Sequence, residues 1–223
     1  MLGDYSQTLM THGPWIVFVF LFGACVGSFI NVVNWRMPRG MSLSHPPSRC
    51  PICGGRLRFF RENLPILGWI LLKGKCRYCR ARIHPVYPIT EFVVALAFVG
   101  LYYCLFMSTP SQTWWWEVGG QWWVRQGFLL GWPAFFAVAF LFVGLYSITV
   151  IDARTFMIPL AIPVFITCAA VVLWCVQAFI ARTSGASGLG WPIPATGWMG
   201  TGAAIGGMLG VGVSMVLQMA GVF

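Results

Sequence analysis

Four cysteines arranged as two Cys-x-x-Cys pairs are the residues of this chain with the clearest chemical potential. Cys50 and Cys53 form the first pair, Cys76 and Cys79 form the second, and 22 residues separate the pairs. Each pair can form one turn that presents two thiolates to the same ion, so the pattern is typical of a tetrahedral zinc site with four sulfur ligands. A redox-active pair and a zinc ribbon that binds nucleic acid are the alternatives.

The cysteines lie in the one long polar stretch of the chain, residues 36–85, which also carries most of the positive charge. This loop holds 11 of the 14 lysines and arginines, and its only acid is Glu62. The basic residues are Arg36, Arg39, Arg49, Arg56, Arg58, Arg61, Lys73, Lys75, Arg77, Arg80 and Arg82. Cations near a thiol favour the thiolate, which is the form that binds a metal.

Apolar runs flank the loop, and the whole chain is 58% hydrophobic and only 9% charged. A soluble domain usually carries about 25% charged residues, and a run of roughly 20 apolar residues is long enough to cross a bilayer. The sequence therefore predicts an all-α, polytopic helical membrane protein and excludes an ordinary soluble domain. The five predicted spans are residues 14–35, 86–107, 128–151, 158–180 and 197–223.

The charge of the loop predicts its side of the membrane. Because basic loops stay in the cytoplasm, we expect residues 36–85 to be cytoplasmic and the tryptophan-rich segment 108–126 to lie outside. The cytosol is reducing, which argues against two structural disulfides. We divide the chain into a first segment with one span, 1–35, the zinc-binding loop, 36–85, and a membrane core, 86–223.

Several residues in the spans predict contacts between helices. Gly23 and Gly27 are four residues apart and favour the close approach of another helix. Polar side chains follow towards the loop, at Ser28, Asn31 and Asn34, where they can bond between helices or face a wet cavity. Glu91 stands near the start of the second span, where a carboxylate needs a partner or water. An arginine of the loop is one such partner.

A series of motifs now points to a family. The segments are GSFINVV (27–33), CPIC (50–53), ENLPILGW (62–69), GKCRYC (74–79) and YPITE (87–91). In this order they resemble the bacterial type IV prepilin peptidases, which are membrane aspartic endopeptidases and N-methyltransferases of type IV pilus and type II secretion systems. Further along, Ile151-Asp152 followed by Ile158-Pro159 resembles the segment that carries the first catalytic aspartate of the family.

The resemblance implies a function and a place in the cell. The protein would sit in the bacterial inner membrane and cut the basic leader of prepilins or pseudopilins at the cytoplasmic face. It would then methylate the new amino terminus with S-adenosylmethionine as the methyl donor. Asp152 would be a catalytic acid, and Cys50, Cys53, Cys76 and Cys79 would hold a structural zinc. The expected partners are prepilins and the lipid bilayer, with no nucleic acid.

One part of the family pattern does not occur in residues 1–223. An aspartic peptidase needs two carboxyl groups that share a proton, and the family places the second in a Gly-x-Gly-Asp motif, which is not found here. Glu91 is a conceivable substitute, and Asp152 could instead be a helix-end charge paired with Arg154. We therefore expect that the chain as given does not cleave prepilins. A non-catalytic membrane scaffold that binds prepilins or secretion components is the alternative function.

Overall fold

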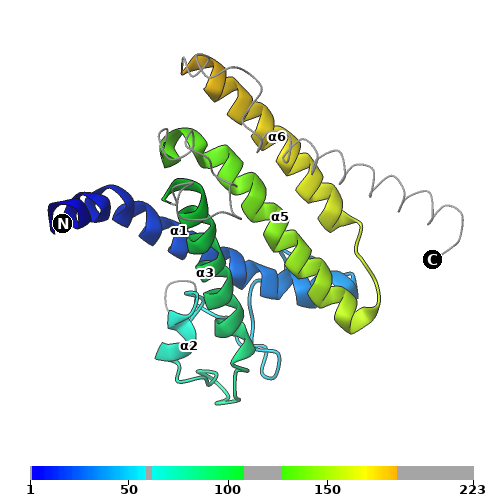
Figure 1. Cartoon of the computed structure of the whole chain (residues 1–223). Coiled ribbons are helices and arrows are strands. Elements are labelled where there is room, and N and C mark those ends of the chain that lie inside the picture. The colour runs from blue at the N-terminus through cyan, green and yellow to red at the C-terminus, as the bar shows by residue number, and fades with distance from the viewer. Residues whose placement is uncertain (1, 59–61, 108–126, 185–223) are drawn as a thin grey trace, which may run out of the picture. The chain divides into compact units, whose positions relative to one another are not determined.

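The regular elements of the protein are helices (Figure 1). The structure is a computed structural model and describes residues 2–58, 62–107 and 127–184. Its elements are α1 (Leu2–Arg36), the 3-10 turn η1 (Met37–Arg39), α2 (Leu67–Leu71), α3 (Val86–Phe106), α5 (Phe128–Thr155) and α6 (Ala161–Thr183). Within these residues there is no strand, only two isolated antiparallel bridges. The predicted all-α class is confirmed.

Four of the described helices are long and apolar enough to cross a membrane, namely α1, α3, α5 and α6. They coincide with the first four predicted spans. The fifth predicted span, 197–223, and the tryptophan-rich segment 108–126 lie outside the described residues. Two helices are longer than predicted, because α1 continues through Pro14 and α5 runs past residue 151 to Thr155. Phe156 ends α5 in a left-handed conformation, and its N–H donates to the Asp152 carbonyl.

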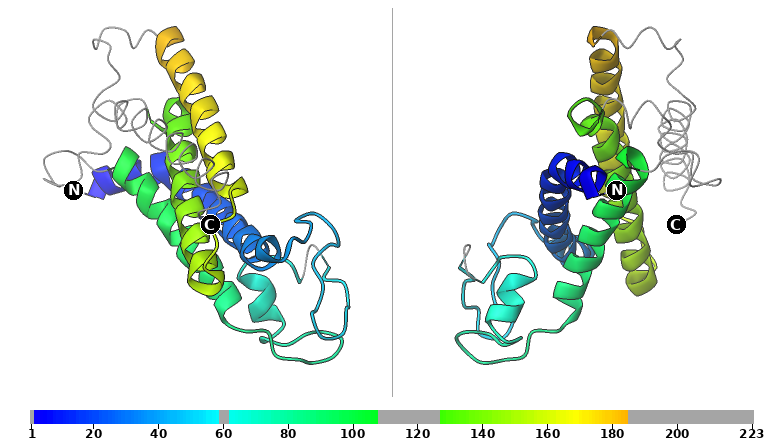
Figure 2. Two further views of the ribbon diagram at one scale, coloured as in Figure 1. Left: turned by 90° about the vertical axis from the view of Figure 1, so that its right-hand side faces the viewer. Right: turned by 60° about the vertical axis from the view of Figure 1, so that its left-hand side comes forward.

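The chain divides into two compact units, residues 1–100 and 101–223. In the first unit, α1 and α3 lie side by side, and the polar loop with α2 connects them (Figure 2). A Cβ atom added to Gly23 would lie 2.9 Å from the Ala95 Cα, and one added to Gly27 would lie 2.7 Å from the Glu91 Cα. The two glycines therefore permit the close helix contact that their spacing predicted.

Polar contacts between α1 and α3 lie at the loop end of this pair. The Asn31 side-chain amide donates to the Tyr87 carbonyl over 3.2 Å. Of the two roles considered for this residue, it therefore has the bond between helices. Asn34 is buried, and its Oδ1 atom has no hydrogen-bond donor among the described residues. The apolar core of the pair includes Val19, Ile30, Val94, Ala95 and Phe98.

In the second unit, α5 and α6 form an antiparallel pair (Figures 1 and 2). Pro133 lies inside α5, where its missing N–H interrupts the hydrogen-bond ladder of the helix. The Gln177 side chain of α6 bonds to α5 at this place. Its Oε1 accepts from the Ala134 N–H over 3.4 Å, and its Nε2 donates to the Leu130 carbonyl over 3.0 Å. A buried amide thus joins the two helices.

Candidate functional site: a tetracysteine centre

The four cysteines predicted from the sequence converge on one point. Their Sγ atoms all lie within 4.8 Å of one another. The sulfurs of Cys50 and Cys79 are 3.8 Å apart, and those of Cys53 and Cys76 are 3.9 Å apart. A tetrahedral zinc ion with Zn–S bonds of about 2.3 Å requires sulfurs about 3.8 Å apart, whereas a disulfide requires about 2.05 Å. The arrangement fits a metal ion and leaves all four thiols free of disulfides.

A short turn with its own hydrogen bonds positions the first pair. The Cys50 N–H donates to the Gly55 carbonyl over 2.9 Å, and the Gly54 N–H donates back to the Cys50 carbonyl over 2.9 Å. An antiparallel bridge between Arg49 and Arg56 closes the base of the turn. Gly54 adopts φ 68°, a left-handed conformation that costs glycine nothing sterically. The turn therefore presents both sulfurs on one side.

The second pair repeats the first turn bond for bond. The Cys76 N–H donates to the Ala81 carbonyl over 2.8 Å, and the Arg80 N–H donates to the Cys76 carbonyl over 3.0 Å. A bridge between Lys75 and Arg82 closes this turn. Arg80 occupies the position equivalent to Gly54 and adopts φ 60°. The two turns are thus equivalent halves of one centre, and each contributes two sulfurs.

Two thiols of the centre, those of Cys50 and Cys79, differ in acidity because their hydrogen bonds differ. Backbone N–H groups of Cys53 and Ile52 act on the Cys50 sulfur and lower its pKa to about 6. The Ala81 N–H lowers the pKa of Cys79, but burial and hydrogen bonds with the three other thiols outweigh it and raise that pKa to about 11. One thiolate therefore forms readily at neutral pH. A bound cation would favour ionisation of the others.

Glu62, the only acid of the loop, bonds to Arg58 just after the first cysteine turn and to Arg77 within the second. Its Oε1 accepts from the Arg77 guanidinium over 3.1 Å, and its Oε2 accepts from the Arg58 N–H over 3.1 Å. Its side chain is only 2% exposed. Burial raises the pKa of Glu62, but the Arg58 N–H and the Arg77 guanidinium outweigh burial and hold it below its ordinary value. Glu62 thus stays charged and bonded at neutral pH.

A second acid, Glu91, connects the loop to the helices. Its Oε2 accepts from the Ile66 N–H over 2.6 Å, at the residue that precedes α2. Ile66 adopts φ 61°, a conformation that a β-branched residue adopts only under constraint. The Ser28 side chain of α1 bonds to the same carboxylate. Among the described residues, the partners found for Glu91 are thus a backbone N–H and a hydroxyl, whereas the sequence suggested an arginine.

Trp69 of α2 bonds to and packs against the second half of the loop, at Ile83 and Gly74. Its indole N–H donates to the Ile83 carbonyl over 3.1 Å. The ring lies against Gly74, which adopts φ 66° and where an added Cβ would lie 2.9 Å from the ring. Sequence analysis did not identify this contact or the Glu62–Arg77 pair. Because Glu62 is the only acid among the 11 basic residues of the loop, an ion pair could have been expected for it. Which basic residue it pairs with depends on how the loop folds.

Asp152 is the residue that the resemblance assigns to catalysis. It belongs to the second unit, whereas the cysteines, Glu62 and Glu91 belong to the first. Its side chain is exposed, in the last turn of α5. Among the residues that the structure describes, Asp152 and Arg154 form no ion pair. Residues two apart on a helix face different directions, so their side chains do not meet. A carboxylate at the carboxyl end of a helix also opposes the helix dipole. Helix stability therefore does not explain this residue.

Comparison with known proteins identifies the part of the chain that carries the centre. Residues 21–105 match the family model of the bacterial peptidase A24 N-terminal domain. The prepilin leader peptidase/N-methyltransferase of Myxococcus xanthus (strain DK1622) is 46% identical over 97 residues, which are 40% of this chain and 29% of that protein. No solved structure matches the chain.

Two further relatives bear related names. The type 4 prepilin-like proteins leader peptide-processing enzyme of Escherichia coli O78:H11 (strain H10407 / ETEC) is 40% identical over 117 residues, covering 44% of this chain and 42% of that protein. The prepilin leader peptidase/N-methyltransferase of Dickeya chrysanthemi is 30% identical over 169 residues, covering 65% and 50%. The chain thus spans half or less of the length of these relatives.

The matched region contains the tetracysteine centre, Glu62, Glu91 and the helix contact at Gly27, and it ends before Asp152. The resemblance that the motifs of residues 27–91 predicted is therefore confirmed by independent matches of the same region. The chain is similar to the type IV prepilin peptidases, and its residues 21–105 correspond to the N-terminal domain of that family.

Proposed function

We propose that the protein serves the removal of leaders from prepilins or pseudopilins, as a membrane endopeptidase at the cytoplasmic face of the bacterial inner membrane. The observation that carries this proposal is the match of residues 21–105 to the peptidase A24 N-terminal domain, with relatives named for leader processing. The four apolar helices support a membrane location. The names of the relatives also support methylation of the new amino terminus, with S-adenosylmethionine as the donor.

The tetracysteine centre is assigned a structural zinc. Four thiolates fill the tetrahedral shell of zinc and leave no position for water or substrate, so the ion would stabilise the loop without taking part in the reaction. The separation of 3.8–3.9 Å between sulfurs of opposite turns supports this assignment. The loop has few elements of its own, since α2 has only 5 residues, so metal binding would supply much of its folding free energy.

The zinc assignment is tested by metal analysis of protein purified under reducing conditions. We expect about one zinc per chain, with an all-sulfur tetrahedral signature in X-ray absorption. Replacing Cys76 with serine should release the ion and expose the loop to proteases, whereas replacing Cys175 of α6 with serine should change neither. Protein without zinc, or zinc retained equally in both variants, would refute the assignment.

For the cleavage step we assign Asp152 one of two carboxyl roles. In such a pair the ionised carboxylate takes a proton from water, and the neutral carboxylic acid donates one to the peptide carbonyl. Crowding of like charges creates the two roles, so one carboxylate alone cannot fill both. Glu91 is a poor second acid because its carboxylate already accepts from Ile66 and Ser28. Residues 1–223 contain no Gly-x-Gly-Asp motif to supply another.

Leader release from a purified prepilin, followed by mass spectrometry, tests this assignment. We expect no release by residues 1–223 alone, and release when a segment bearing Gly-x-Gly-Asp is appended. Asp152→Asn in the extended chain should abolish release, because members of a catalytic unit act together, and Asp4→Asn is the matched control. Zinc content confirms that each variant is folded.

Two outcomes would contradict these expectations. Cleavage by residues 1–223 that disappears in Asp152→Asn would mean that the second acid is already present, in this chain or in a second copy. An extended, zinc-loaded chain that binds prepilin but never cuts it would favour the non-catalytic scaffold.

A further inference from the structure

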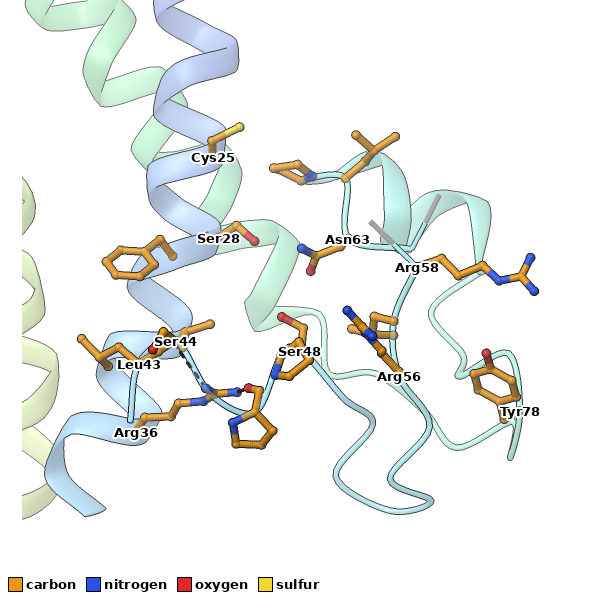
Figure 3. Close-up of a pocket in the computed structure, with 17 residues that line it drawn as sticks. Cys25, Ser28, Arg36, Leu43, Ser44, Ser48, Arg56, Arg58, Asn63 and Tyr78 are labelled. Carbon is orange, nitrogen blue, oxygen red and sulfur yellow. Dashed lines mark hydrogen bonds between the residues drawn. The ribbon is translucent and has the colours of Figure 1, made fainter. Parts of the chain in front are cut away.

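An open cavity of about 970 Å³ lies within the first unit, between the loop-proximal half of α1 and the polar loop (Figure 3). Segments 43–48, 56–58 and 63–65 of the loop form its other walls. Three arginines line it, Arg36, Arg56 and Arg58, and none of its lining residues is acidic. The cavity therefore has a positive potential, which favours an anionic occupant and disfavours a basic one.

Two of the three arginines are already engaged by the protein. Arg36 donates to the backbone carbonyls of Ser42, Leu43 and Pro46, over 3.0, 3.4 and 2.8 Å, and so holds the floor of the cavity in place. Arg58 interacts electrostatically with the Glu62 carboxylate, and Figure 3 shows its side chain directed away from α1. Neither guanidinium is well placed to bind a ligand in the cavity.

Arg56 is the arginine that the fold leaves available. Its side chain is exposed, and among the described residues its guanidinium has no hydrogen bond or ion pair. In Figure 3 it points into the space between α1 and the loop, where the side chains of Ser48 and Asn63 also point. A guanidinium, a hydroxyl and an amide are the donors that a phosphate group accepts from.

The opposite wall of the cavity belongs to α1 and is mostly apolar, with Ser28 as a polar side chain among the apolar ones. Cys25, Phe29 and Val32 of α1 line it, and all three fall within the 10–39 stretch that is long and apolar enough to cross a membrane. Phe29 is 54% exposed. The cavity thus places a cationic group beside an exposed apolar side chain of α1. A ligand that fits both parts has an anionic head and a hydrocarbon tail.

We propose that this cavity binds one anionic phospholipid, with its phosphate on Arg56, Ser48 and Asn63 and an acyl chain along the α1 face at Phe29. The charge of the lining and its continuity with the span favour a lipid over a soluble anion. Basic groups just cytoplasmic of a span attract anionic lipids of that leaflet. This site goes beyond leader cleavage, and its positive lining is unsuited to the basic leader itself.

The test counts lipids bound to the zinc-loaded chain in detergent by native mass spectrometry. Phosphatidylglycerol is titrated against phosphatidylcholine with the same acyl chains. Arg56→Gln removes the cationic group, and Arg56→Lys keeps its charge. The matched control is Arg82→Gln, because Arg82 is exposed, occupies the position equivalent to Arg56 in the second cysteine turn, and does not line the cavity. Zinc content and circular dichroism confirm the fold of each variant.

We expect one phosphatidylglycerol to be retained in preference to phosphatidylcholine. Arg56→Gln should weaken its binding about tenfold, as expected for loss of one charge-assisted contact, while Arg56→Lys and Arg82→Gln should keep most of it. Equal binding of the two lipids, or equal weakening by Arg56→Gln and Arg82→Gln, would overturn the proposal. Displacement of the lipid by millimolar inorganic phosphate, or by a short acidic peptide, would assign the cavity to that soluble anion or peptide instead. Because no variant alters Asp152 or the cysteines, failure here is distinguishable from failure of the leader-cleavage function.

Discussion

Gly54 and Arg80 occupy the same backbone position in the two cysteine turns, with φ angles of 68° and 60°. Glycine adopts this left-handed conformation without steric cost, whereas any other residue brings its Cβ close to a carbonyl oxygen. The first turn therefore carries the favoured residue and the second a disfavoured one. Glycine and arginine can thus be compared at equivalent backbone positions of the tetracysteine centre.

We predict that Arg80→Gly stabilises the loop by about 1 kcal/mol, because it relieves the left-handed strain of a residue with a side chain. The reverse change, Gly54→Ala, should destabilise the loop by a similar amount, although an added Cβ meets no other atom within 4 Å. Thermal unfolding of the zinc-loaded protein measures both. Arg80→Ala is the control, since it removes the same charge without freeing the backbone. Equal stabilisation by Arg80→Ala and Arg80→Gly would attribute the effect to charge.

The ion pair between buried Glu62 and the partly exposed Arg77 leads to a prediction about pH. The pKa of Glu62 is lower in the folded protein than in the unfolded chain, because the Arg58 N–H and Arg77 outweigh burial. Its contribution to stability is therefore present above the unfolded pKa of about 4.3 and is lost as the pH falls through the folded pKa. At neutral pH, Glu62→Gln should cost about 1–2 kcal/mol, a range that allows for the solvent-exposed Arg77.

Unfolding midpoints of the parent and Glu62→Gln, measured with zinc bound between about pH 7.5 and about pH 5.5, check this prediction. The difference between the two midpoints should be constant over this range, because Glu62 stays ionised in both states throughout it. Arg77→Gln should lose less than Glu62→Gln, since the side chain of Arg77 is 43% exposed and that of Glu62 only 2%. A difference that grows as the pH falls within this range would contradict the prediction, because it would mean that folding raises the pKa of Glu62.

At the residue scale, the sequence predicted the parts of the site whose geometry depends on residue spacing alone. Two Cys-x-x-Cys pairs predicted the convergence of four sulfurs because each pair forms its own local turn. It did not find the partners of Glu62 and Glu91, which come from residues 15 and 25 positions away. Such bonds depend on how the loop folds against the helices, and no periodic pattern encodes them.

At the scale of elements, the contact between α5 and α6 depends on a proline and an amide. Pro133 has no N–H, so it leaves α5 with a locally opened hydrogen-bond ladder. Gln177 is buried, with 2% exposure, and bonds to both Ala134 N–H and Leu130 C=O at this opening. In lipid such backbone groups find no water, so a neighbouring side chain is the available partner.

We predict that Gln177→Leu weakens the α5–α6 pair by about 1 kcal/mol, the usual value of a polar contact between membrane helices. The loss should be smaller in a Pro133→Ala background, because α5 can then restore its own ladder. A double-mutant cycle on unfolding in detergent measures this coupling. In its neutral form Gln177→Glu keeps one acceptor oxygen and one O–H donor, so it should weaken the pair less than Gln177→Leu does. Identical losses with and without Pro133 would mean that the amide stabilises the pair independently of the proline.

The elements themselves were largely predictable from hydropathy. Long apolar runs located α1, α3, α5 and α6, and the Gly23–Gly27 spacing located the face of α1 that meets α3. Helix ends were less predictable, because residues 152–155, three of which are polar, continue α5 until Phe156 adopts a left-handed conformation. The five-residue helix α2 was not predicted at all. Its start depends on the bond between Ile66 and Glu91, which is a tertiary contact.

At the scale of the whole molecule, the distribution of charge is the feature with the largest consequence. The chain has a net charge of +9, yet 11 of its 14 basic residues lie in residues 36–85. The segment between the second and third spans contains one basic residue, Arg125, and the segment after the fourth begins near Arg182. Translocation of a short loop with many lysines and arginines is strongly disfavoured. The proposed leader cleavage and the proposed anionic-lipid site both require residues 36–85 at the cytoplasmic face.

We therefore predict that a reporter inserted at Arg56 lies in the cytoplasm and that one inserted at Gly119 lies outside. Fusions of alkaline phosphatase, which is active only outside, and of a fluorescent protein that matures only inside, give opposite signals at the two positions. A variant with Arg36, Arg39 and Arg49 changed to glutamine should keep this orientation, because eight basic residues remain in the loop. Phosphatase activity from the Arg56 fusion would contradict the topology. It would also argue against zinc binding by residues 36–85, because an oxidising compartment would favour disulfides over four free thiolates.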